Sequence, residues 1–357
     1  MPLTCGIIGL PLVGKTTLFN LLTQAEAETS SFAGRTKTNV RTAVIPDPRL
    51  DYLASLYRPR KVTPATLEVI DIPGLTPGSG AAFLAAVRQV DALVQVVRAF
   101  RNEAVVHVKE TIDPLRDMEI LNTELLLADM QMVETRLERI AAGKKVKKEN
   151  LVEQAALKRC LEALEQEMPI AEAGLSEEEW QAIRSLDFLT TKPMIIVVNI
   201  DEEQLQKGYF EKEEEVLAYS SEKGIPVLKI CAQIEAEIAR LEPEERIDFM
   251  KELGIEEPGI ARLARTIYRR LGLISFLTVG EDEVRAWTIK AGTNARAAAG
   301  KVHSDMERGF IRAEVVSFDD LYRLGDMQKV KENGLCRLEG KDYIVQDGDI
   351  INFRFNV

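Results

Sequence analysis

The octapeptide Gly9-Leu10-Pro11-Leu12-Val13-Gly14-Lys15-Thr16 constrains the fold of this chain more than any other feature. Two glycines bracket four residues and are followed by Lys-Thr, which is the P-loop pattern. An apolar run, residues 5–8, precedes the loop, and residues 17–22 continue as an amphipathic helix. Such a loop directs its backbone N–H groups and the positive end of the helix toward phosphate oxygens. We therefore expect a nucleoside triphosphate to bind here.

The polar residues of the loop have separate expected roles. Lys15 would reach the β- and γ-phosphates, and the Thr16 hydroxyl would be a Mg²⁺ ligand. Further nucleotide contacts are expected from Leu12, Val13, Gly14 and Thr17.

A second motif, Asp71-Ile72-Pro73-Gly74, ends the apolar run 67–72. Asp71 lies where P-loop enzymes place the carboxylate that holds Mg²⁺, directly or through water. The Gly74 N–H is expected to face the γ-phosphate and so to contribute to catalysis together with Lys15. A DxxG sequence alone is usually a turn, but its distance from the P-loop favours the functional interpretation.

Composition narrows the class of protein. The chain has 357 residues, of which 46% are hydrophobic and 29% charged, enough for two or three globular domains. It contains no apolar run of about eighteen residues. Four scattered cysteines form no CxxC pair, so we expect neither a zinc site nor a disulfide framework, and we expect a cytoplasmic protein. The net charge of −11 argues against non-specific nucleic-acid binding by the whole surface.

The chain divides into three predicted parts. Apolar strands alternating with helices predict an α/β P-loop nucleotide-binding domain that is discontinuous, at residues 1–120 and 190–273. Helical spacing in residues 121–189 predicts an inserted antiparallel helical hairpin. Its basic turn, residues 144–148, is either a contact to rRNA phosphates or a solvated loop. Strand, helix and returning strands in residues 274–357 predict a small α+β module such as a β-grasp.

Two loops after predicted strands are candidates for recognition of the base. Asn199-Ile200-Asp201-Glu202 stands where P-loop GTPases carry Asn-Lys-x-Asp, with Ile200 in place of the lysine and Glu202 in place of the aspartate. The longer carboxylate weakens the case for guanine. Cys231-Ala232-Gln233 follows the next strand, and the Gln233 amide is able to contact either base. The alternative for the first loop is an acidic turn with no role in the base site.

Several long runs resemble the YchF family of Obg-like ATPases, in the Obg branch of P-loop GTPases. They include Val97-Arg98-Ala99-Phe100, Asn122-Thr123-Glu124-Leu125, Glu283-Val284-Arg285-Ala286-Trp287-Thr288 and Gly309-Phe310-Ile311-Arg312-Ala313-Glu314. The resemblance implies a coiled-coil insertion, a C-terminal TGS domain of β-grasp fold, ATP preferred over GTP, and association with ribosomes or RNA. It also matches His107 to a histidine proposed to assist hydrolysis, although an isolated His in an apolar run is more often a packed residue.

The chain departs from the family at the nucleotide. Leu12 replaces an asparagine that helps to coordinate a monovalent cation in related enzymes, and switch II is shorter. Arg35 stands where the family has its Mg²⁺-contacting threonine, so Thr36 is the substitute candidate. The sequence therefore predicts a slow Mg²⁺-dependent ATPase that acts as a switch toward a ribosome, RNA or protein partner. The alternatives are a nucleotide-gated binding module with little hydrolysis, and a GTPase.

Overall fold

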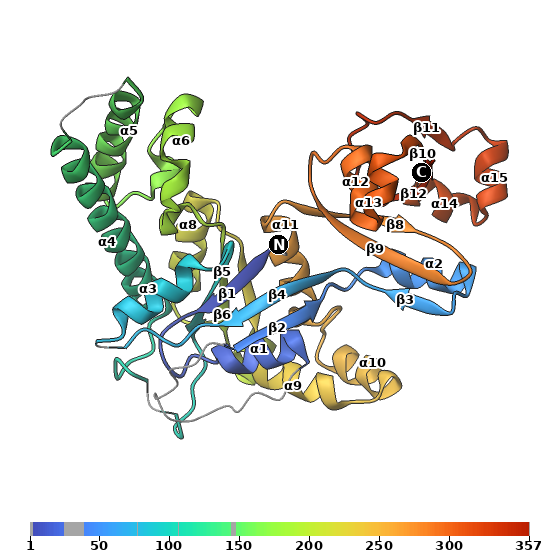
Figure 1. The fold of residues 1–357 in the computed structure, drawn as a ribbon. Helices are drawn as coiled ribbons and strands as arrows, with labels where there is room; N and C mark the ends of the chain where they lie inside the picture. The colour runs from blue at the N-terminus through green and yellow to red at the C-terminus, as the bar shows by residue number, and fades with distance from the viewer. Residues whose placement is uncertain (1–2, 25–38, 77, 106, 144–147, 357) are drawn as a thin grey trace. The chain divides into compact units, whose positions relative to one another are not determined.

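The computed structural model describes residues 3–24, 39–76, 78–105, 107–143 and 148–356 (Figure 1). The chain forms two compact units, one of residues 1–41 and 68–260 and the other of residues 42–67 and 261–357. In the described part of the chain, no helix is long and apolar enough to span a membrane.

The first unit is built on a six-stranded sheet of order β2-β4-β1-β5-β6-β7. Its strands are β1 (Thr4–Ile8), β2 (Asn39–Val44), β4 (Thr66–Asp71), β5 (Ala92–Arg98), β6 (Met194–Asn199) and β7 (Val227–Ile230). β1 pairs in parallel with β4 and β5, and β6 pairs in parallel with β5 and β7. All seven residues of β5 are buried, as expected of a strand covered on both faces. The predicted α/β fold class is confirmed.

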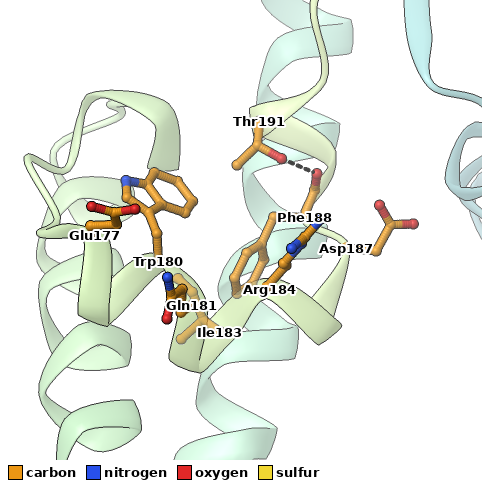
Figure 2. A pocket seen from close by; sticks show the side chains of 8 residues that line it. All are labelled: Glu177, Trp180, Gln181, Ile183, Arg184, Asp187, Phe188 and Thr191. Carbon is orange, nitrogen blue, oxygen red and sulfur yellow. Dashed lines mark hydrogen bonds between the residues drawn. The ribbon is translucent and has the colours of Figure 1, made fainter. Parts of the chain in front are cut away.

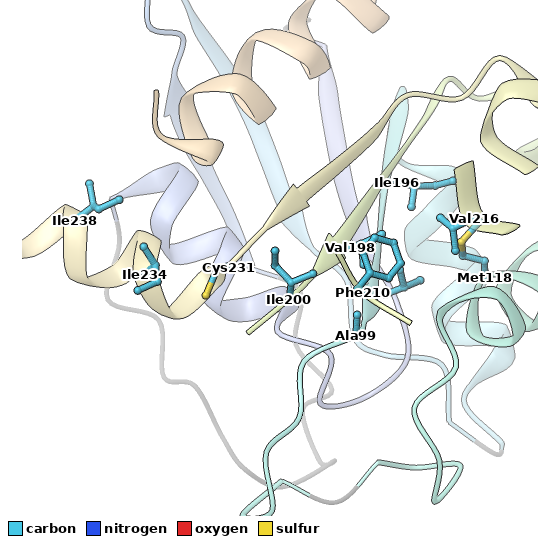
Figure 3. Close-up of a cluster of buried hydrophobic side chains, with 11 residues drawn as sticks. Ala99, Met118, Ile196, Val198, Ile200, Phe210, Val216, Cys231, Ile234 and Ile238 are labelled. Carbon is cyan, nitrogen blue, oxygen red and sulfur yellow. The ribbon is translucent and has the colours of Figure 1, made fainter. Parts of the chain in front are cut away.

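Helices cover this sheet and form a hydrophobic core with it. They are α1 (Lys15–Thr23), α3 (Gly80–Arg88), α7 (Glu202–Lys207), α8 (Glu213–Lys223), α9 (Ala232–Arg240) and α10 (Pro243–Glu252). The next helix, α11 (Gly259–Arg270), belongs to the second unit from residue 261 onward. One buried cluster joins β5 and β6 to α8 and α9 through Val97, Val198, Val216 and Ile234 (Figure 3). This packing places the carboxyl ends of β5 and β6 beside the first turn of α9.

The predicted helical hairpin is present between β5 and β6. α4 (Pro114–Ala141) and α5 (Lys148–Glu165) pack side by side, with α6 (Glu177–Ile183) against α5 (Figure 1). Asp113 caps α4 by accepting the Arg116 N–H, and proline occupies the first helical position. Short 3₁₀ turns follow α5 and α6, at Ile170–Glu172, Arg184–Leu186 and Leu189–Thr191. Most of the basic turn, residues 144–147, lies outside the described residues.

The second unit contains a six-stranded sheet of order β11-β10-β12-β8-β9-β3. Its strands are β3 (Lys61–Thr63), β8 (Leu273–Thr278), β9 (Glu283–Lys290), β10 (Phe310–Ser317), β11 (Arg337–Glu339) and β12 (Asp349–Phe355), and its helices are α2 (Pro48–Tyr57), α12 (Ala295–Val302), α13 (Ser304–Arg308), α14 (Phe318–Leu324) and α15 (Met327–Glu332). Most pairs are antiparallel, but β12 runs parallel to β8 and β3 parallel to β9.

Residues 42–67 belong to this second unit, although the sequence assigned them to the nucleotide-binding domain. β3 extends the sheet along β9, where the Thr63 hydroxyl donates to Glu283 Oε1 at 2.5 Å. The Arg49 guanidinium binds both Asp47 and Asp347, at 2.8 and 2.9 Å. The Thr63–Glu283 and Arg49–Asp347 contacts join residues 220 and 298 positions apart in sequence, so no local sequence pattern predicts them.

The structure settles two local details of this unit. α12 is capped by Asn294, whose side chain accepts the Ala297 N–H, and not by Thr293, whose hydroxyl donates to Lys290 O. The run Tyr343-Ile344-Val345 forms no strand and makes only an isolated bridge between Ile344 and Asn294.

Candidate functional site

The P-loop joins β1 to α1 through a backbone that side chains would obstruct. Gly14 has φ 99°, and a Cβ there would lie 2.3 Å from Asn199 Nδ2. A Cβ on Gly9 would lie 2.5 Å from the Val96 carbonyl oxygen. Both distances are far below van der Waals contact, so the two glycines of the motif are required by close packing.

Lys15 is buried in this loop, with 8% of its surface exposed. Its Nζ donates to the Leu10 carbonyl oxygen at 2.7 Å. Burial lowers the pKa of Lys15 to about 8, and the nearby Asp71 carboxylate opposes that shift. An anionic phosphate beside the ammonium would favour its charged form, so the site gains from a negatively charged ligand.

Thr16 and Asp71 converge at the end of the loop. The Thr16 hydroxyl donates to Asp71 Oδ2 at 2.8 Å, and Asp71 is the buried last residue of β4. Mg²⁺ in phosphate sites takes one or two protein oxygens plus phosphate oxygens and water. This pair of oxygen donors fits that ion. Among the described residues, no group of three or more His, Cys, Asp or Glu side chains forms a site from protein ligands alone.

The switch II glycine lies directly against the P-loop. A Cβ on Gly74 would be 2.9 Å from Pro11 N and 3.0 Å from Lys15 Nζ. Any side chain at this position would therefore displace the Lys15 ammonium or the loop backbone. The structure thus brings Lys15, Thr16, Asp71 and Gly74 together, whereas Thr36 lies outside the described residues.

Leu12 adopts a left-handed backbone conformation, with φ 63°. This region is unfavourable for a branched aliphatic residue and tolerated by asparagine. A leucine at this position therefore offers no side-chain oxygen and carries backbone strain that asparagine would tolerate. The two neighbouring candidates are unstrained: Val13 is fully buried, and Thr17 lies in the first turn of α1.

Asn199 connects three parts of the nucleotide site. It is buried at the end of β6, its Nδ2 donates to the Val13 carbonyl oxygen at 3.0 Å, and its Oδ1 accepts the Ala232 N–H at 3.1 Å. The amide thus ties the P-loop to the first turn of α9. Both ends of the Asn199 amide are therefore bonded within the protein, where they position these two loops.

The positions around Asn199 differ from those of a guanine-reading loop. Ile200 is 3% exposed and packs in the core with Cys231, as Figure 3 shows, so it cannot lie along a base. Asp201 caps α7 by accepting the Gln204 N–H. Glu202 and Gln233 are exposed in the first turns of α7 and α9. Exposed polar groups therefore remain only at these last two positions of the two predicted loops.

His107 is a packed residue with both ring nitrogens occupied. Its Nε2 lies 2.8 Å from Asp117 Oδ2, and its Nδ1 accepts the Lys109 N–H at 3.1 Å. Because Nδ1 is an acceptor, the neutral ring carries its proton on Nε2 and donates it to Asp117. The other Asp117 oxygen accepts from Arg116 Nε and Nη2, at 3.0 and 2.7 Å.

Arg98 is a buried residue that sequence reasoning missed. It is the last residue of β5, is 2% exposed, and donates to the carbonyl oxygens of Phe100 and Asn102. Burial lowers its pKa, while the Asp117 carboxylate opposes the shift. Arg98 therefore holds the start of the loop that carries His107. The signal in the sequence was a single charge at the end of an apolar strand.

Comparisons with known proteins agree with this geometry. Residues 4–136 match the family model MMR_HSR1, described as 50S ribosome-binding GTPase, and residues 273–356 match YchF-GTPase_C, described as a protein of unknown function. The chain is 44% identical to the ribosome-binding ATPase YchF of Haemophilus influenzae and to that of Bacillus subtilis, over 100% of each chain. It also superposes on the structure of the Schizosaccharomyces pombe YchF GTPase with a TM-score of 0.88 and 32% identity, covering 99% of this chain and 98% of that one.

Proposed function

The chain belongs to the YchF family of P-loop NTPases, and from that membership we propose that it is a slow Mg²⁺-dependent ATPase that acts as a switch. The observation that carries the proposal is the convergence of Lys15 Nζ, the Thr16–Asp71 pair and Gly74 at the mouth of the P-loop. Its relatives are named ribosome-binding, so we propose a ribosome, through rRNA or a ribosomal protein, as the partner. A partner of that kind places the protein in the cytoplasm.

Each residue of the site has a defined task in this proposal. The backbone N–H groups from Val13 to Thr17 bind the phosphates, and Lys15 neutralises charge that develops on the transferred phosphoryl group. Thr16 and Asp71 would hold Mg²⁺, which would supply charge stabilisation to the phosphoryl group. The Gly74 N–H donates toward the γ-phosphate from a position where no side chain fits.

Adenine is the base that the site favours. Ile200 removes the lysine that supports guanine binding, and Glu202 is longer than the aspartate that pairs with it. We propose that Asn199, Ala232 and Gln233 shape the base pocket, with Glu202 at its rim. Calorimetric titration with ATP and GTP tests this point, and tighter binding of GTP would replace the ATPase with a GTPase.

A binding module with little hydrolysis is the second candidate. It is favoured by the occupied nitrogens of His107, which must leave Asp117 before the ring is able to assist an attacking water, and by Leu12, which has no oxygen for a cation. Single-turnover assays separate the two functions. Phosphate release above the Lys15→Ala background supports the ATPase, and release equal to that background supports the binding module.

A separate experiment tests whether Leu12 prevents a monovalent cation from binding beside the phosphates. Because Leu12 offers no ligand, we expect hydrolysis by the natural protein to respond little to potassium. Leu12→Asn is expected to create a response and, since asparagine tolerates the left-handed conformation, to raise thermal stability slightly. Strong potassium stimulation of the natural protein would contradict this assignment.

The other parts of the chain are proposed as the partner-binding modules. We assign residues 274–357 to a TGS domain on the basis of their strand order and the placement of their helices. Residues 121–189 form the helical insertion. Cosedimentation of the full chain with ribosomes, with ATP or without nucleotide, tests whether binding depends on nucleotide.

A further inference from the structure

The helical insertion contains a pocket remote in sequence from the nucleotide motifs. It lies between α6 and the turns that follow, with a volume of about 390 Å³, a size typical of ligand sites. Its lining is Glu177, Trp180, Gln181, Ile183, Arg184, Asp187, Phe188 and Thr191 (Figure 2). The pocket therefore has an apolar part and a polar rim, as in sites that take an amphipathic group.

The apolar part is rigidly supported. Ile183 and Phe188 are 1% and 3% exposed and belong to the core that α4 and α5 form with the turns. Asp129, fully buried on α4, accepts the N–H groups of Leu189 and Thr190 at 2.9 and 2.8 Å, which fixes the turn that carries Phe188. Trp180 remains partly exposed on the opposite side of the pocket in Figure 2. Because Ile183 and Phe188 are fixed by the core and the Trp180 indole is accessible, the site is preformed.

The charged residues around the pocket favour a cationic ligand. Glu177 lies beside Trp180 in Figure 2, and the lining carries two carboxylates and one guanidinium, that of Arg184. Residues 165–192 contain seven Asp or Glu and two Arg or Lys, and two of the acids, Glu179 and Glu172, pair with Arg159 and Lys223. One of the two lining carboxylates, Asp187, also lies 3.4 Å from Lys192 Nζ. A phosphate backbone would be repelled by this segment, whereas a cationic group would be attracted.

We propose that this pocket binds an arginine side chain presented by a basic segment of a protein partner. The aliphatic part of that arginine would lie over the buried Phe188 and Ile183 and pack mainly against the accessible Trp180 indole, because long cationic side chains bury their stems on apolar surface. Its guanidinium would stack on the Trp180 indole and pair with the Glu177 carboxylate. The indole, the carboxylate and the apolar floor together match the three parts of that side chain.

A hexaarginine peptide tests the site. The chain has two tryptophans, so Trp287→Phe leaves Trp180 as the only indole, and saturable change of its fluorescence on titration is expected. Calorimetry with Glu177→Gln is expected to weaken binding about two- to fivefold. Glu178→Gln, the same charge change on the neighbouring residue, which does not line the pocket, is expected to leave binding unchanged. Trp180→Leu, which keeps an apolar side chain without the indole, is expected to weaken it about two- to fivefold.

Several outcomes would overturn the proposal. Equal weakening by Glu177→Gln and Glu178→Gln would show diffuse attraction to an acidic surface. Saturable binding of a single-stranded RNA hexamer in the absence of the peptide, weakened by Trp180→Leu, would show a nucleic-acid site. Thermal melting of each variant establishes that it is folded. Lys15→Ala is expected to abolish hydrolysis without changing peptide binding, so failure of this site and failure of the proposed ATPase are distinguishable.

Discussion

The two units each contain a six-stranded sheet, but their strands run differently. In the first unit β1, β4, β5, β6 and β7 are parallel, so their carboxyl ends meet at one edge. Three of these strands end in buried polar residues, Asp71, Arg98 and Asn199. In the second unit the strands are mostly antiparallel, and the buried Ser275 and Asp349 bond to tyrosine hydroxyls within the unit.

This difference in strand direction explains why the candidate ligand-binding residues lie in the first unit. A parallel sheet gathers several strand ends at one edge, where loops converge on a ligand. A mainly antiparallel sheet distributes its strand ends over both edges, and its buried polar groups satisfy one another. Three pairs of matched substitutions compare the same change in the two units, and a fourth pair compares two positions of the second unit.

The largest effect is expected for Gly14→Ala. The added methyl group would lie 2.3 Å from Asn199 Nδ2 at a positive φ, so we expect loss of ATP binding by calorimetry and a loss of about 2–4 kcal/mol in the free energy of unfolding. Gly292→Ala, at φ 85° with open space around the Cβ, is expected to cost about 1 kcal/mol and to leave ATP affinity unchanged. Equal effects of the two would refute the close-packing argument.

Asp71→Asn is expected to slow single-turnover ATP hydrolysis about 100-fold, equivalent to about 3 kcal/mol, because it removes charge from the Mg²⁺ site. A higher Mg²⁺ concentration is expected to restore part of the rate. Asp349→Asn, at the buried start of β12, is expected to lower the free energy of unfolding by about 1 kcal/mol with hydrolysis unchanged. Hydrolysis that survives Asp71→Asn would remove this residue from the site.

Lys15→Met is expected to stabilise the nucleotide-free protein at pH 7 by about 2–3 kcal/mol, because it removes a buried charge. The folded pKa of Lys15, about 8, lies below the unfolded value of 10.5, so the unfolded chain binds more protons between these values. The free energy of unfolding of the natural protein therefore increases as the pH rises from 8 to 10.5. The amount by which Lys15→Met is more stable than the natural protein decreases over the same range. Lys61→Met, at an exposed position of β3, is expected to change the free energy of unfolding by less than about 0.5 kcal/mol. Denaturant unfolding at several pH values measures both, and a constant difference would contradict burial of the charge.

The smallest effect is expected for Arg49→Ala. It removes the ion pairs to Asp47 and to Asp347, of which the second attaches the segment 42–67 to the rest of the second unit, and is expected to lower the free energy of unfolding by about 1–2 kcal/mol. Arg60→Ala, whose side chain is 86% exposed, is expected to change stability by less than about 0.5 kcal/mol. Thermal melting measures both, while ATP hydrolysis is expected to stay at the natural rate. A reduced rate in Arg49→Ala would show that the second unit influences the nucleotide site.

Much of the nucleotide-binding unit was predictable because its signals are local. The P-loop spacing, the strand that precedes it and the DxxG motif at a strand end are each contained within about ten residues. The helical hairpin was predictable for the same reason, since helical spacing is a short-range pattern. Ile200 was recognised as a departure from guanine-reading loops, but its burial depends on packing against α9.

The sequence by itself determined the fold class, the phosphate-binding loop and the candidate Mg²⁺ oxygens, because spacing along the chain dictates backbone geometry at those positions. Only the tertiary structure decided that residues 42–67 join the C-terminal sheet, that Asn199 ties the P-loop to α9, and that His107 is held by Asp117. The pocket beside Trp180 is likewise a product of packing. Each of these depends on contacts between distant segments, whose free energy comes from burial and hydrogen bonding that no short stretch of sequence contains.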